Sequence, residues 1–188
     1  MITIIKDVAF LMQDNFYELA NADKQPKSTL AVALIRDALL PEILGADNNI
    51  LYWAGKRLAR NFPIAKDEEI PVFFEQADWG ELKRIKSKKD QQYFQLTGDI
   101  VKMRQKLNPK SEFLLEAGFL AETIQNQLGF ITEVVIDKKT HDSVTFLAQI
   151  DPKDAIDLDS VDERKPLTIE PLSLDVADEP EAEENDKA

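Results

Sequence analysis

A helical segment with small side chains on one face is the feature that most constrains the fold of this chain. Residues 113–130, FLLEAGFLAETIQNQLGF, have the spacing of an amphipathic helix, yet Ala117, Gly118 and Ala121 interrupt its bulky apolar positions. A glycine inside a helix costs about 1 kcal/mol relative to alanine. We therefore expect the small face to let the helix backbone lie close against the sheet or against a neighbouring helix.

The ends of this helix can be predicted from the residues that flank it. It should run from about Glu112 to Leu128, with Ser111 as its N-cap and Gly129 just beyond its C-terminus. Its apolar stripe should consist of Phe113, Ala117, Leu120, Ile124 and Leu128.

Two further helices are predicted nearer the N-terminus. Ser28 can cap a helix from Thr29 to about Leu40, after which Pro41 marks a turn. The segment NILYWAGKRLARNFP has apolar residues at helical spacing and ends at a proline. Its predicted stripe is Leu51, Ala54, Gly55, Leu58 and Phe62. On this helix the basic residues Lys56, Arg57 and Arg60 should face solvent.

The remaining elements indicate an α/β (α+β) fold. Two strands are predicted at 82–87 and 91–97, joined by the charged turn KSKKD, and 130–137 with 143–150 should form a closing antiparallel hairpin. KDEEIPVFFEQADWG reads as a short helix, whereas periodicity leaves IVKMRQKL open between a third strand and a short helix. We therefore expect an antiparallel sheet of about four strands packed by helices.

Charge and composition divide the chain of 188 residues into three parts. Residues 1–27 form an N-terminal extension with a predicted helix, 28–150 form the α/β domain, and 151–188 form an acidic tail expected to be disordered. The tail has 14 acidic and 4 basic residues, a net charge of −10, whereas residues 1–150 have a net charge of only −2. Because acidic chains are repelled by phosphate backbones, we expect no nucleic-acid partner.

Several classes of site are missing from the sequence. There is no cysteine, so disulfides and thiolate chemistry are excluded. The single histidine, His141, lies in the polar stretch DKKTHDS, which we interpret as a solvated turn. No signal peptide and no apolar run long enough to span a membrane is recognised. We expect a soluble cytoplasmic protein with no metal and no cofactor.

Three segments in fixed order resemble the YslB family of low-GC Gram-positive bacteria. These are YWAGKRLARNFP, FFEQADWG and LEAGFLAE, and the resemblance covers about residues 28–150. That family is similar in turn to 4-vinyl-reductase-type domains and to transport-protein-particle subunits. The matching positions of this wider similarity are Gly55 and Leu58, then Ala117, Gly118 and Phe119.

The resemblance implies an antiparallel α/β architecture, an apolar cavity and a tendency towards helix-mediated pairing. Some members of the superfamily use cysteines or a haem-ligating histidine. This chain has no cysteine, and its only histidine lies in a predicted turn. The resemblance therefore does not imply those activities here.

Two functional hypotheses follow. The first is a non-catalytic protein-interaction module, whose partner is either an unknown protein or, in a homodimer, a second copy of the chain. An exposed apolar patch on helix 29–40 or 51–62 would be its sign. The second is a binding or sensor domain for a small apolar ligand between the Gly118 helix and the sheet. Candidates for this ligand or packing site are Tyr52, Trp53, Gly55, Phe73, Phe74, Phe113, Ala117, Gly118 and Phe119.

An enzyme is the least favoured hypothesis. Acidic pairs such as Glu68 with Glu69, or Glu116 with Glu122, are of the residue type that serves as acid and base. Glu116 and Glu122 are six residues apart, however, and so point to different sides of one helix. We interpret them as surface charge and assign no catalytic residue.

Overall fold

The computed structural model describes residues 29–45, 49–109, 111–157 and 165–169. Its elements alternate helices with two hairpins in the order predicted. The helices are α3 (Thr29–Ala33), η1 (Leu34–Leu39), α4 (Leu40–Leu44), α5 (Asn49–Asn61), α6 (Glu69–Gln76), α7 (Asp99–Leu107) and α8 (Leu114–Leu128). The strands are β1 (Glu81–Lys88), β2 (Gln91–Thr97), β3 (Phe130–Lys139) and β4 (Val144–Ala155). The helix expected within residues 1–27 lies outside the described residues.

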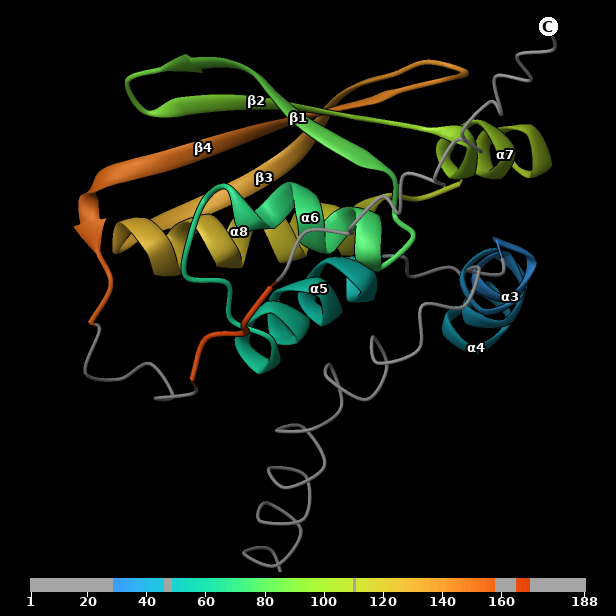
Figure 1. Cartoon of the computed structure of the whole chain (residues 1–188), viewed down its shortest axis with the longest axis horizontal. Coiled ribbons are helices and arrows are strands. Elements are labelled where there is room, and N and C mark those ends of the chain that lie inside the picture. Colours follow the sequence, from blue (N-terminus) through green and yellow to red (C-terminus); the bar gives the residue numbers. More distant parts are fainter. Residues whose placement is uncertain (1–28, 46–48, 110, 158–164, 170–188) are drawn as a thin grey trace, which may run out of the picture.

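The four strands form one antiparallel sheet in the order β1-β2-β4-β3. Helices α5, α6 and α8 lie on one side of it, and no described element covers the other side (Figure 1). The side chains that alternate towards the helices are buried, including Phe94, Leu96, Phe146 and Ala148. The predicted α/β class, with a four-stranded antiparallel sheet packed by helices, is confirmed.

The first helical segment is longer than predicted. Elements α3, η1 and α4 follow one another without a break, so we call residues 29–44 helix 29–44. It does not end at Pro41, because η1 is a π-helical turn in which the N–H of Leu40 donates to the carbonyl of Ile35, five residues back. The wider turn lets the helix continue through a proline that has no N–H to donate. The predicted cap Ser28 lies outside the described residues.

Two other predictions need correction. Ser111 is not the N-cap of α8, because Phe113 occupies that position and the buried Ser111 hydroxyl makes no hydrogen bond within the described part of the chain. The segment IVKMRQKL, left open between strand and helix, belongs to α7. At its other end α8 stops as expected, with Gly129 in the left-handed conformation and its N–H bonded to Gln125 O at 2.8 Å.

The ordered structure also extends beyond the predicted boundary at Ile150. Strand β4 continues to Ala155, and Ile156 N–H donates to Gly129 O at 3.0 Å. Further along, Leu167 N–H donates to Pro63 O at 2.8 Å, and Ile169 is buried against the core. These two stretches of the predicted tail are therefore joined to the domain, the first through backbone hydrogen bonds and the second also through the buried side chain of Ile169. The rest of the tail lies outside the described residues.

Candidate functional site

The small face of α8 lies directly against α5, which explains the glycine in its middle. A Cβ atom at Gly118 would lie 1.9 Å from the carbonyl oxygen of Tyr52. Reciprocally, a Cβ atom at Gly55 would lie 2.1 Å from the carbonyl oxygen of Leu115. The two helices therefore touch backbone to backbone, and no side chain fits at either position. The close approach predicted for this helix is confirmed, and its partner is a helix, not the sheet.

The aromatic candidates on α6 and α8 fill the adjacent core. The rings of Phe73 and Phe119 are stacked with centroids 4.6 Å apart, and Trp79 stands edge-on to Phe119 at 5.3 Å and to Phe74 at 5.1 Å. Phe74 and Phe119 are fully buried. Close-packed rings of this kind account for these positions as core residues.

The other candidates are distributed between core and surface. Phe113 is fully buried beneath the guanidinium of Arg104, and Ala117 is fully buried on α8. Tyr52 is half-buried, whereas Trp53 is 63% exposed. The structure thus brings together most of the candidates, and the exposed ring of Trp53 stands edge-on to that of Tyr52 with centroids 5.8 Å apart. Because α5 occupies the space at Gly118, the small face of α8 is filled by protein.

Helix α5 is rotated relative to its predicted orientation. The residues that it buries are Gly55, Lys56 and Ala59, while Ala54 is exposed. Lys56, expected in solvent, lies with its ammonium 2.9 Å from Glu133 on β3. The prediction failed because lysine was assigned to the surface by default, whereas a buried lysine is stable when a carboxylate faces it.

A small polar group joins α5 to the free edge of β3. Tyr52 donates its hydroxyl hydrogen to Glu133 and accepts the N–H of Val134 at 3.2 Å. Thr132 N–H is accepted in the same way by the side chain of Gln125 on α8, at 3.3 Å. Burial, followed by the hydrogen bond to Glu133, raises the pKa of the Tyr52 phenol above its usual value, so the hydroxyl stays protonated.

Helix 29–44 is attached to the domain by a buried group of four charges, Arg36, Asp37, Arg104 and Glu116, which we call the four-charge cluster. Arg36 Nη2 lies 2.8 Å from Glu116 Oε2, an ion pair whose alignment falls short of a hydrogen bond. Arg104 donates to Glu116 at 3.0 Å and to both carboxylate oxygens of Asp37, at 2.9 and 3.0 Å. The cluster thus joins η1, α7 and α8.

The electrostatics of the cluster keep Glu116 ionised. Burial alone would raise the pKa of this fully buried carboxyl, but Arg36 and Arg104 together hold it below its ordinary value of 4.5. Burial likewise opposes the charge of Arg104, yet Glu116 and Asp37 keep the pKa of its guanidinium raised. Two cations face two anions, so the cluster carries no net charge into the core.

The interpretation of Glu116 and Glu122 as surface charge was therefore wrong. Both carboxylates are buried, and Glu122 accepts a hydrogen bond from Arg60 Nε at 2.5 Å. Each finds an arginine that lies far away in the sequence, which is why inspection of α8 alone could not reveal the pairing. The only local signal is that Glu116 lies beside the apolar stripe of the helix.

The outer face of helix 29–44 is apolar. Leu30 and Ile43 are each 67% exposed, and Leu34, Ile35 and Leu39 are more than half exposed. We call these five residues the apolar face of helix 29–44. Its inner side carries Arg36 and Asp37, so the helix buries charge and exposes aliphatic side chains. Figure 1 shows the segment at one end of the molecule, beside α7, where the bond from Arg104 to Asp37 also places it.

Two other kinds of site are absent from the described part of the chain. No group of histidine and acidic side chains there has the geometry to hold a metal ion. Likewise, none of the described helices combines the length and hydropathy needed to cross a bilayer.

Comparison with known proteins agrees with the resemblance that the motifs indicated. Residues 29–149 match the profile of a family described as protein of unknown function (DUF2507). The chain is 44% identical over 130 residues to the uncharacterized protein YslB of Bacillus subtilis (strain 168), a match that covers 67% of this chain and 86% of that protein. A vinyl-4-reductase family protein from Methanocaldococcus jannaschii has a similar fold, with a TM-score of 0.56 at 17% identity over 78% of this chain and 94% of the other.

Proposed function

The chain belongs to the DUF2507 family, and we propose that it acts as a non-catalytic protein-interaction module of the bacterial cytoplasm. The partner that we propose is a second copy of the chain, bound through the apolar face of helix 29–44. This choice of partner rests on the orientation of the helix. Its charged residues Arg36 and Asp37 point towards the domain, and its aliphatic side chains point away from it.

The apolar face carries the proposal. Leu30 and Leu34 are four residues apart, as are Ile35, Leu39 and Ile43, so the exposed side chains form rows along the helix. Monomeric soluble proteins rarely expose large apolar patches, and such patches mark interaction sites. Burying apolar surface stabilises an interface by about 25 cal/mol per Å², and these five residues supply the side chains for it.

The choice of a second copy has two supports. The family match begins at residue 29, so helix 29–44 is the first element of the shared module, while residues 1–28 lie outside it. In addition, a row of aliphatic side chains complements itself, so two copies can pack the same face together across a two-fold axis. Arg36 and Asp37 do not oppose this pairing, because both are engaged in the four-charge cluster.

The absence of catalysis is supported by the state of the acidic candidates. A general acid at neutral pH needs a raised pKa, whereas the pKa of Glu116 is lowered by two arginines. Glu122 is held by Arg60 on the other side of α8. The two carboxylates are therefore committed to separate ion pairs, and neither is available to a substrate.

Analytical ultracentrifugation of the full chain tests the proposal. We expect the wild type to be a dimer at about 100 μM and the double variant Leu34→Glu/Leu39→Glu to be a monomer, with association weakened at least about 100-fold. The matched control is Ile85→Glu/Val135→Glu, which places two glutamates at exposed apolar positions on the sheet and should remain dimeric.

Three outcomes would overturn self-association. These are a monomeric wild type, a control variant as disruptive as the test variant, or a monomer whose unfolding free energy falls when Leu34 and Leu39 are changed. The last result would assign the apolar face to another part of the same chain. Native mass spectrometry of the same samples tests the ligand hypothesis. A compound retained by every wild-type chain would favour an apolar-ligand domain over an interaction module.

A further inference from the structure

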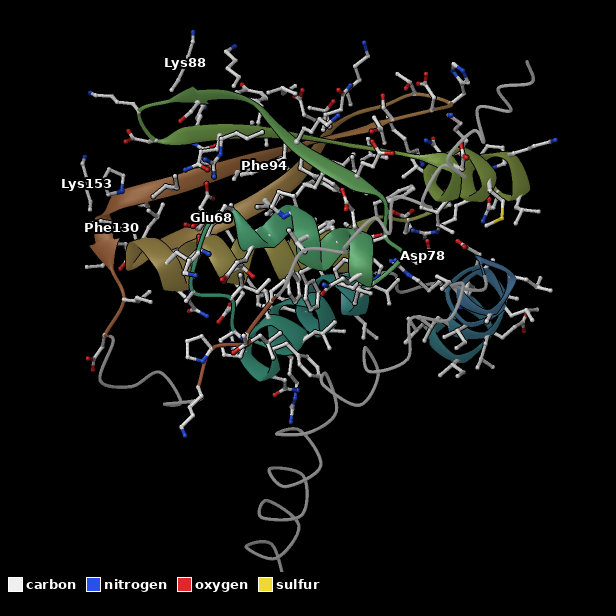
Figure 2. All side chains as sticks on the ribbon, viewed as in Figure 1. Glu68, Asp78, Lys88, Phe94, Phe130 and Lys153 are labelled. Carbon is white, nitrogen blue, oxygen red and sulfur yellow. The ribbon has the colours of Figure 1, made fainter. Side chains whose placement is uncertain are left out.

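The hairpin of β1 and β2 carries an unusual concentration of positive charge. Of the eight residues of β1 only Leu82 is buried, and the exposed side chains include Lys83, Lys86 and Lys88, with Lys89 in the turn that follows. We call these four lysines the basic hairpin. Figure 2 shows Lys88 pointing away from the body of the molecule at the tip of this hairpin.

The lysines of the basic hairpin differ from five other cations of the domain, which are each paired with a carboxylate. Arg36, Lys56, Arg60, Lys66 and Arg104 each lie within 3.0 Å of a carboxylate oxygen. In contrast, no carboxylate of the described residues forms an ion pair with any lysine of the basic hairpin. Only Arg84, on the same strand, has such a partner, Asp67.

The C-terminal region is attached to the domain at a point whose distance from this hairpin can be bounded. Leu167 N–H is bonded to Pro63 O, and Ile169 is buried against the core. Four residues after Pro63, Asp67 pairs with Arg84 on β1. Because a residue spans at most about 3.6 Å, residue 167 lies within roughly 25 Å of Arg84.

Those following residues are strongly acidic. Residues 170–188 contain eight acidic side chains and one lysine, and six of the acidic ones fall within 178–186, DEPEAEEND. The nine residue-to-residue steps from Ile169 to position 178 can span about 30 Å, enough to bring this segment to β1. Its attachment at residues 167–169 keeps it at high effective concentration there.

We propose that residues 178–186 bind to the basic hairpin of the same chain. In this arrangement the tail supplies the carboxylates that Lys83, Lys86, Lys88 and Lys89 lack, and it covers a surface that would otherwise attract other polyanions. The family match ends at residue 149, so residues 178–186 lie outside the matched region.

Zero-length cross-linking of the full chain tests the contact. A carbodiimide joins a lysine amine to a touching carboxylate as an amide with loss of water. We expect links from Lys86, Lys88 or Lys89 to residues 178–186 at 50 mM salt, reduced at least fivefold at 1 M NaCl, where the Debye length is only about 3 Å. Exposed Lys106 and Lys138 serve as reference lysines within the same molecule.

A mixture of ¹⁴N- and ¹⁵N-labelled chains shows whether the links form within one chain. Links that carry mixed labels would overturn the intramolecular contact in favour of one between copies. Equal yields at the reference lysines, or no tail links at the hairpin, would also overturn it. The lysines would then serve only to keep an exposed edge strand from pairing.

Retention on immobilised heparin provides a second measurement. In the full chain, changing the six acidic residues of 178–186 to their amides should raise the salt concentration needed for elution. Adding Lys86→Gln/Lys88→Gln should reverse this increase, whereas Lys106→Gln/Lys138→Gln, which removes the same charge, should not. The proposal fails if both pairs have the same effect, because retention would then follow net charge and not the basic hairpin.

Discussion

Helix α5 and helix 29–44 are both held by α8, but by opposite means. Between α5 and α8 the glycines at 55 and 118 remove side chains, so the two backbones touch. Helix 29–44 instead reaches α8 through Arg36 and Glu116, and its aliphatic side chains face outward. The first attachment depends on shape and the second on charge balance. Among the described residues, α5 exposes two large apolar side chains, Ile50 and Trp53, whereas helix 29–44 exposes five.

The largest effect should come from breaking the shape-dependent contact. Gly118→Ala places a methyl group 1.9 Å from the Tyr52 carbonyl, which is backbone and cannot rotate away. We expect a loss of about 4 kcal/mol or more in the free energy of unfolding, or failure to fold, measured by urea denaturation. Gly129→Ala is the control, because its Cβ meets nothing within 4 Å and only its φ of +76° opposes the change, at about 1 kcal/mol. Equal losses for the two variants would refute a backbone contact.

A smaller loss should follow from unbalancing the charge-dependent contact. Glu116→Gln keeps the shape of the side chain but leaves two buried arginines facing one carboxylate, and we expect a loss of about 3 kcal/mol. Glu122→Gln should cost about 1 kcal/mol or less, because its partner Arg60 is half exposed to solvent. Adding Arg36→Met to Glu116→Gln should recover part of the loss by removing the unpaired cation. If it does not, charge balance is not what holds helix 29–44.

The smallest effect should be a dependence on pH of the unfolding free energy that Glu116→Gln loses. The pKa of Glu116 lies below its ordinary value of 4.5 in the folded chain. Its stabilising contribution is therefore complete above pH 4.5 and decreases as the pH falls towards the folded pKa. We expect the difference in unfolding free energy between the wild type and Glu116→Gln to be constant from pH 7 to 5 and to shrink below pH 4.5. A difference that stays constant down to pH 3 would mean that the folded and unfolded pKa values are equal.

Much of the fold was predictable because its signals are local. The two hairpins, the glycine that ends α8 and the close approach at Gly118 each follow from a few adjacent residues. The orientation of α5 could not be predicted from local signals. The burial of Lys56 depends on Glu133, which lies 77 residues further along the chain. The burial of Glu116 depends in the same way on Arg36 and Arg104. A single sequence does not reveal such pairings, and each charge was placed in solvent because an unpaired buried charge is costly.

The apolar face of helix 29–44 was foreseen only as a possible sign of an interaction module. The aliphatic residues of this segment look in sequence like the buried stripe of any amphipathic helix. What turns them outward is the four-charge cluster on the opposite side. The candidate surface is thus a consequence of the same distant ion pairs that the sequence analysis missed.

The four-charge cluster can form only after much of the chain has been synthesised. Asp37 is made 67 residues before Arg104, and Glu116 follows later still. At a synthesis rate of about 5–20 residues per second, Arg104 and Glu116 are added several seconds after helix 29–44. The first described element to be made is therefore attached to the domain only after α7 and α8 have been made.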